Sequence, residues 1–270
     1  MDLHEIVDLT RYPIDGSKTT ALAHLIEACQ GELAAVGASV LEGFVRPEAI
    51  ARIVAHVDPL APLAFHKVKQ HNVYLEPDDP SMPENHPRNA KETTTSATLG
   101  NHHLQNAADL QALYAADAFK AFVAATLGYP KLFPYDDAVS GVNVLFYPPR
   151  TTLGWHFDNS TFTTTLMIRE ADAGAAFEYV PFLRTDTDRA YDAIAALQSG
   201  ERTGVRQLHQ SDGTLVLFKG SRTVHRVTPV EGPTTRLLAA MTFSPQPGAR
   251  LAPINQKTFY DYTAPDNSMS

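Results

Sequence analysis

Between Ser140 and about residue 245 the chain is a succession of short β-prone segments separated by turn residues, and this pattern limits the fold more than any other feature of the sequence. Val142–Tyr147 and Thr161–Ile168 are the clearest strands, and Asp212-Gly213 and Glu231-Gly232 are turn signals between later ones. Further strands are expected at residues 154–157, 176–180, 214–218, 224–228 and 236–243. Many short strands with glycine-bearing turns, preceded by helices, predict a double-sheet β barrel packed on helices.

The first half of the chain predicts helices that support this barrel. Apolar residues recur at spacings of three and four between Ser17 and Gly37, which indicates one buried helical face closed by glycine. Pro47 suits the first turn of a second helix, and residues 108–127 predict a third. A short inserted helix is expected at residues 188–197.

A proline-rich segment, residues 76–100, interrupts the helical half and predicts an irregular loop. A loop of this length is usually either a disordered excursion or an active-site lid. We expect a single domain over residues 1–270. Residues 1–139 would be mainly helical support, 140–245 the β core with the metal site, and 246–270 a C-terminal extension.

Composition excludes several classes of function. The apolar fraction of 44% allows a buried core, and the formal net charge is −8. That sign argues against sequence-independent nucleic-acid binding, which depends on Lys and Arg, and no basic run favours an anionic membrane. Cys29 is the single cysteine, so neither an intramolecular disulfide nor a thiolate metal cluster can form. We interpret the chain as cytoplasmic, since its start lacks the pattern of a signal peptide.

The stretch from Gly154 to Ser160 contains the candidate metal ligands. Side chains two apart on a strand share a face, so His156 and Asp158 would present an imidazole and a carboxylate together. His225, on a later predicted strand, is the natural third ligand. Two histidines and one carboxylate suit iron(II) and leave its opposite positions open. A His-x-Asp pair alone is weak support, because eleven histidines produce such a pair by chance.

Arg236 strengthens the prediction. If Glu231-Gly232 is a two-residue hairpin loop, Val227 lies opposite Arg236 and His225 opposite Leu238. Arg236 would then be one diagonal step from the third ligand, on the order of 7 Å away. An arginine inside a barrel needs an anionic partner, and a dicarboxylate that chelates iron at its other end would supply one.

These residues together resemble the iron(II)/2-oxoglutarate-dependent dioxygenase family, particularly its prolyl-hydroxylase-like branch. The resemblance rests on the stretch YPPRTTLGWHFD (residues 147–158), on AAFEYVP (residues 175–181), and on His225 followed eleven residues later by Arg236. It covers roughly residues 140–245 and is specific for the superfamily rather than for a substrate.

The resemblance implies a distorted double-stranded β-helix, the cupin-like jelly roll, with iron held by His156, Asp158 and His225. It implies 2-oxoglutarate as cosubstrate with O2, and succinate and carbon dioxide as products. Arg236 matches the position that binds the distal carboxylate. Tyr147 lies where some relatives place a tyrosine that touches the cosubstrate, and Thr164 would add a hydroxyl to the same cosubstrate site. Related halogenases carry a small residue in place of the carboxylate, so Asp158 resembles the oxygenating members.

We therefore predict an oxygenase that hydroxylates or otherwise oxidises a small molecule, such as a free amino acid or a natural-product intermediate. One alternative keeps the fold and metal but is a cupin-like isomerase or hydrolase without 2-oxoglutarate, and Arg236 argues against it. Another is a catalytically dead barrel that acts as a binding module, and the intact triad argues against that.

Overall fold

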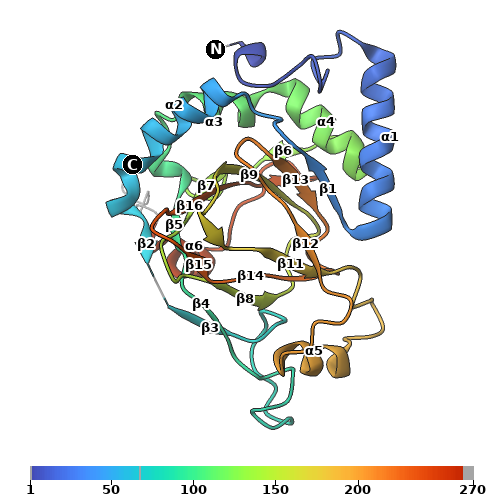
Figure 1. Ribbon diagram of the computed structural model, residues 1–270, viewed down its shortest axis with the longest axis vertical. Coiled ribbons are helices and arrows are strands. Elements are labelled where there is room, and N and C mark those ends of the chain that lie inside the picture. The colour runs from blue at the N-terminus through green and yellow to red at the C-terminus, as the bar shows by residue number, and fades with distance from the viewer. Residues whose placement is uncertain (1, 67, 264–270) are drawn as a thin grey trace.

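Two antiparallel sheets form the centre of the protein in the computed structural model, which describes residues 2–66 and 68–263 (Figure 1). The larger sheet has seven strands and the smaller one four. In spatial order the larger sheet contains β1 (Ala38–Leu41), β13 (Leu215–Phe218), β9 (Thr163–Arg169), β16 (Arg236–Met241), β7 (Val142–Tyr147), β5 (Ala97–Leu99) and β2 (Phe65–His66). The smaller sheet contains β12 (Arg206–Leu208), β11 (Phe177–Val180), β14 (Val224–Val227) and β8 (Leu153–His156).

Helices cover the outer face of the larger sheet (Figure 1). They are α1 (Thr19–Val36), α2 (Pro47–Val57), α3 (Ala108–Ala115) and α4 (Asp117–Leu127). Val142, Val144 and Phe146 of β7 pack on this helical layer, while the alternate residues Asn143 and Leu145 line a cavity between the sheets. Among the described residues, no helix is both long and apolar enough to cross a membrane.

Short pairs of strands complete the β structure. They are β3 (Lys69–His71) with β4 (Glu92–Thr94), β10 (Ala173–Gly174) with β15 (Val230–Glu231), and β6 (Phe133–Pro134) with β17 (Phe243–Ser244). Two helices occupy the periphery, α5 (Tyr191–Gln198) between β11 and β12 and α6 (Pro253–Tyr260) after the last strand. Single 3-10 turns lie at Leu3–Glu5, Asp58–Leu63 and Asn101–His103.

The structure corrects two predictions about the first half. The helix expected over residues 108–127 is interrupted at Ala116, whose backbone is extended (φ −60°, ψ 123°). Alanine is the best helix former, so the break must come from tertiary packing. The segment 76–100 is also not wholly irregular, because it contains β4 and β5. The N–H of Thr95 donates to Thr152 O, just before β8, and Thr95 Oγ1 accepts from the N–H of Thr152. Since β5 pairs with β7, this stretch connects the two sheets.

The predicted hairpin between His225 and Arg236 is also wrong. The strand β14 pairs with β8 and β11, whereas β16 pairs with β7 and β9, so the two strands belong to different sheets. The Cα partner of Arg236 is Tyr147, not Val227. Residues between the strands pair elsewhere, Val230 with Gly174 for example, and this carries the chain from one sheet to the other. The end of the C-terminal extension, residues 264–270, lies outside the described residues.

Candidate metal centre

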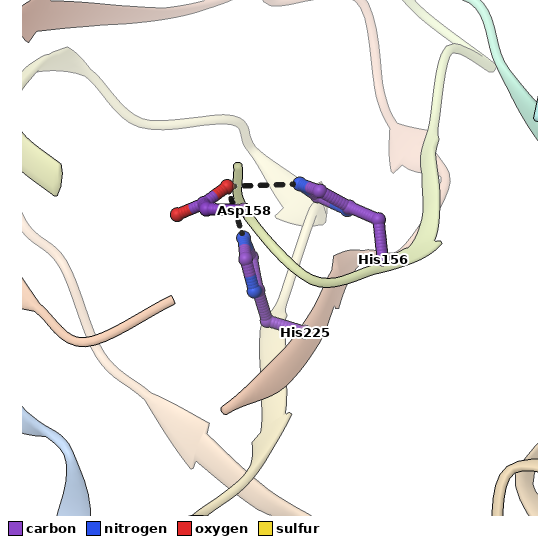
Figure 2. Close-up of side chains that lie close together, drawn as sticks. All are labelled: His156, Asp158 and His225. Carbon is purple, nitrogen blue, oxygen red and sulfur yellow. Dashed lines mark ion pairs between the residues drawn. The ribbon is translucent and has the colours of Figure 1, made fainter. Parts of the chain in front are cut away.

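His156, Asp158 and His225 converge at the inner face of the smaller sheet (Figure 2). The two histidines are direct cross-strand partners on β8 and β14, and their ring centres lie 4.1 Å apart. One oxygen of Asp158, Oδ1, lies 3.5 Å from Nε2 of each histidine. The candidate ligand atoms all lie within 4.8 Å of one another, close enough to share one metal ion.

The alternation of the strand produces this convergence. Trp155 and Phe157 point to the other side of the smaller sheet, where both are buried in an apolar cluster. Backbone hydrogen bonds then fix the end of β8: Phe157 N–H donates to Val73 O at 2.8 Å, and Asp158 N–H donates to Gly220 O at 3.1 Å. The carboxylate therefore reaches back toward the face on which His156 lies.

The protonation of the three side chains suits a divalent metal. Nδ1 of His156 lies 2.9 Å from Gly154 O, and Nδ1 of His225 lies 3.0 Å from Thr223 O. Because a carbonyl can only accept, each Nδ1 carries a hydrogen, and Nε2 is the nitrogen that faces Asp158 and would bind a metal. Burial lowers the pKa of His225. Burial raises the pKa of the Asp158 carboxyl, but the neighbouring His225 and His156 outweigh it and hold that pKa well below its usual range.

The centre opens into a cavity of about 410 Å³ between the two sheets. Its walls include Leu145 and Leu238 from the larger sheet and Leu153 and Val227 from the smaller one. Phe259 and Tyr260 of α6 also line it. The cavity therefore lies between the two sheets, has largely apolar walls, and is partly covered by the C-terminal helix.

Arg236 lies on the larger sheet and is 2% exposed. Its Nη2 donates to Gln210 Oε1 at 3.1 Å, and its guanidinium carbon lies 4.9 Å from the centre of the Tyr147 ring. Its Nη1 is buried and has no hydrogen-bond partner among the described residues. Burial lowers the pKa of Arg236, which reflects a poorly solvated charge. An arginine held in this way fits an anionic ligand that the protein itself does not provide.

The two other residues predicted to contact the cosubstrate, Tyr147 and Thr164, lie in different places. Tyr147 is buried beside Arg236 and lines the cavity. Thr164 is fully buried but lies on the opposite face of β9, paired with Leu217 and Met241 of the outer core. Its hydroxyl has no hydrogen-bond partner in the part of the chain that the structure describes. This placement gives no support to the predicted contact. The adjacent Thr163 and Thr165 line the cavity instead.

Sequence reasoning missed several residues of the site. Thr163 donates to Oδ2 of Asp158 at 2.6 Å, Gln210 contacts Arg236, and His71 has its ring centre 6.1 Å from that of His156. The alternation of β9 could have indicated Thr163, since it shares a face with Thr165. Nothing in the sequence distinguishes Gln210 or His71, because their roles depend on contacts between distant segments.

Two facing antiparallel sheets with a two-histidine, one-carboxylate centre between them define the fold of the 2-oxoglutarate–iron(II) oxygenases. Within that class the chain belongs to the family described as Halogenase D, whose model matches residues 26–259. The comparison with curated protein sequences gives no match.

Solved structures confirm the fold. HygX from Streptomyces hygroscopicus, with nickel, 2-oxoglutarate and hygromycin B bound, is 12% identical, with a TM-score of 0.57 over 83% of this chain and 89% of that chain. The epimerase SnoN from nogalamycin biosynthesis, in complex with Fe3+, alpha ketoglutarate and nogalamycin RO, is 14% identical, with a TM-score of 0.56 over 82% and 84%. A Pseudomonas putida prolyl-4-hydroxylase is 15% identical, with a TM-score of 0.50 over 84% and 100%. The fold that the predicted resemblance implies is thus shared with solved 2-oxoglutarate–iron(II) enzymes, a prolyl hydroxylase among them.

Proposed function

We propose that this protein is an iron(II)- and 2-oxoglutarate-dependent oxygenase that oxidises a small molecule and releases succinate and carbon dioxide. One observation supports this proposal above all others. The His156–Asp158–His225 centre lines the cavity between the sheets, and the incompletely paired guanidinium of Arg236 lines an adjoining pocket that shares Phe177 and Gln210 with that cavity. A 2-oxo diacid has a metal-chelating end and an anionic end, which are the two groups that this pair of features can bind.

Each residue has a definite task in this proposal. His156 and His225 would hold the metal through Nε2, and Asp158 through Oδ1 as an ionised carboxylate. When bound, iron would supply the activation of O2 that is coupled to decarboxylation of the cosubstrate. Arg236 would bind the distal carboxylate, beside the Tyr147 phenol. Arg236 is itself buried, so an ion pair with it would be screened little by water.

The two facing sheets support a distorted double-stranded β-helix within a single domain over residues 1–270, and the cavity volume of about 410 Å³ favours a small substrate. SnoN and HygX, which share the fold, were each solved with a small natural product bound. A free amino acid or a natural-product intermediate is the substrate class we favour, with hydroxylation the simplest outcome. We place the reaction in the cytoplasm.

Membership of the Halogenase D family raises a second outcome, transfer of a halogen instead of oxygen. Asp158 argues against it here. Its Oδ1 faces both histidines, so the carboxylate fills the place where related halogenases, with a small residue, accept chloride. A cupin-like isomerase or hydrolase would leave the Arg236 guanidinium without a ligand, at the cost of an uncompensated buried donor.

The test is anaerobic addition of iron(II) and 2-oxoglutarate to the purified protein, with detection of the weak visible charge-transfer band of the chelate. We expect the band in the wild type, unchanged by added chloride. Arg236→Ala should weaken 2-oxoglutarate binding by at least about 30-fold, because a buried charge pair is lost. Arg169→Ala is the matched control, since Arg169 pairs with Asp58 away from the metal centre.

Two results would contradict the proposal. Absence of the band from metal-loaded wild-type protein would show that 2-oxoglutarate does not chelate the metal and is not the cosubstrate. Retained turnover in His156→Ala or His225→Ala would disprove the ligand assignment.

A further inference from the structure

The two oxygens of Asp158 have different surroundings. Oδ1 faces Nε2 of both histidines at 3.5 Å, whereas Oδ2 turns away and accepts a hydrogen bond from Thr163 Oγ1 at 2.6 Å. Thr163 lies at the start of β9 in the larger sheet, and Asp158 follows β8 of the smaller one. The contact therefore crosses between the sheets and holds one carboxylate oxygen away from the metal position.

Gly220 restricts the same carboxylate from another side. A Cβ added to Gly220 would lie 1.9 Å from Oδ2 and 2.5 Å from Cγ of Asp158, distances that no pair of non-bonded atoms can tolerate. The backbone of Gly220 is not left-handed, so the requirement is for space rather than for conformational freedom. Its carbonyl also accepts the N–H of Asp158. Any larger residue would displace the carboxylate.

We propose that Thr163 and Gly220 are positioning residues that orient Asp158 as a one-oxygen ligand, with Oδ1 toward the metal and Oδ2 bound to Thr163. This inference depends on the proposed function. If the carboxylate bound through both oxygens, it would occupy a position that the cosubstrate or O2 requires. A hydrogen bond to an ionised carboxylate is charge-assisted and short, which suits it to fixing this orientation.

Metal affinity tests the role of Thr163 without cosubstrate or turnover. Thr163→Val removes the hydroxyl at nearly constant shape and should weaken binding of Co(II), measured by calorimetry, by about 10–100-fold. Thr163→Ser keeps the hydroxyl and should restore affinity to within about threefold of the wild type. Thr165→Val is the control, because Thr165 lines the same cavity on the same strand without contacting Asp158.

A double-mutant cycle tests Gly220 in the metal-free protein. Gly220→Ala should lower the thermal midpoint by several degrees in the wild type, but by less than about one degree in an Asp158→Gly background, where the clashing atoms are gone. Gly31→Ala, on α1 with open space around its Cβ position, is the control for an added methyl group.

The outcomes separate the two proposals. Unchanged Co(II) affinity in Thr163→Val, or equal effects of Gly220→Ala in both backgrounds, would overturn the positioning role alone. Failure of the wild type to bind Co(II) would overturn the metal centre and the proposed function with it. Co(II) binding without the iron–2-oxoglutarate band would contradict only the choice of cosubstrate.

Discussion

The guanidinium of Arg236 is buried, and its Nη1 has no hydrogen-bond partner among the described residues. Gln210 accepts from Nη2, and the face of Tyr147 lies against the guanidinium. Burial raises the pKa of the Tyr147 phenol, which therefore stays protonated and can act as a donor. Together the two side chains form a polar pair beside the cavity that suits a carboxylate.

Tyr147→Phe tests whether the phenol contacts the cosubstrate. It should weaken 2-oxoglutarate binding by about 2–10-fold, the value of one hydrogen bond, and leave iron binding intact. Titration of the charge-transfer band with 2-oxoglutarate measures the effect. Tyr129→Phe is the control, because Tyr129 packs on Phe162 outside the cavity. If the Tyr147→Phe variant bound 2-oxoglutarate as tightly as the wild type, the phenol of Tyr147 would not contact the cosubstrate.

The residues that the sequence could indicate are those whose neighbours in the chain define their role. His156 and Asp158 were accessible because strand alternation places them on one face, and His225 because it lies on another strand of the core. Arg236 was inferred from an incorrect hairpin; its actual link to the site is Tyr147, its partner in the larger sheet, which lines the cavity of the metal centre. Gly220 and Thr163 could not be predicted, because each acts through Asp158 across a tertiary contact.

At the scale of elements, the segment after β3 supports the metal centre from outside the smaller sheet. Tyr74 is 1% exposed and stacks on Phe157, the residue between two of the ligands, with ring centres 5.6 Å apart. Its hydroxyl donates to Arg189 O at 2.8 Å, near the start of α5. The neighbouring Val73 accepts the N–H of Phe157. No sequence pattern marks Val73 and Tyr74, which precede the proline-rich segment 76–100, because their roles come from these contacts with later segments.

Tyr74→Ala should destabilise the protein by about 3–5 kcal/mol, since it removes a large buried ring. Tyr74→Phe retains the ring and loses only the hydroxyl, so its cost should be about 1 kcal/mol. Urea unfolding of the two variants measures both values. The alanine variant should also bind Co(II) more weakly, because the backbone from His156 to Asp158 loses its outer support. Equal destabilisation by the two substitutions would show that the ring does not provide this support.

At the scale of the whole molecule, the site is divided between the two sheets. The three metal ligands lie on or beside strands of the smaller sheet, whereas Arg236 and Tyr147 lie on the larger one. A metal ion alone therefore contacts one sheet. A diacid bound to the metal and to Arg236 would connect both, so its binding should stabilise the native state against separation of the sheets.

Thermal unfolding with Ni(II), which does not support turnover, tests this division. With 2-oxoglutarate at about 100 times its dissociation constant, the nickel-loaded protein should gain about 2.7 kcal/mol, or roughly 5–10 °C in midpoint. Pyruvate keeps the chelating 2-oxo acid but lacks the distal carboxylate, so at the same concentration it should stabilise the wild type much less. In Arg236→Ala the two acids should become equivalent. If 2-oxoglutarate still exceeded pyruvate in that variant, the distal carboxylate would have to bind elsewhere, and Arg236 would not connect the cosubstrate to the larger sheet.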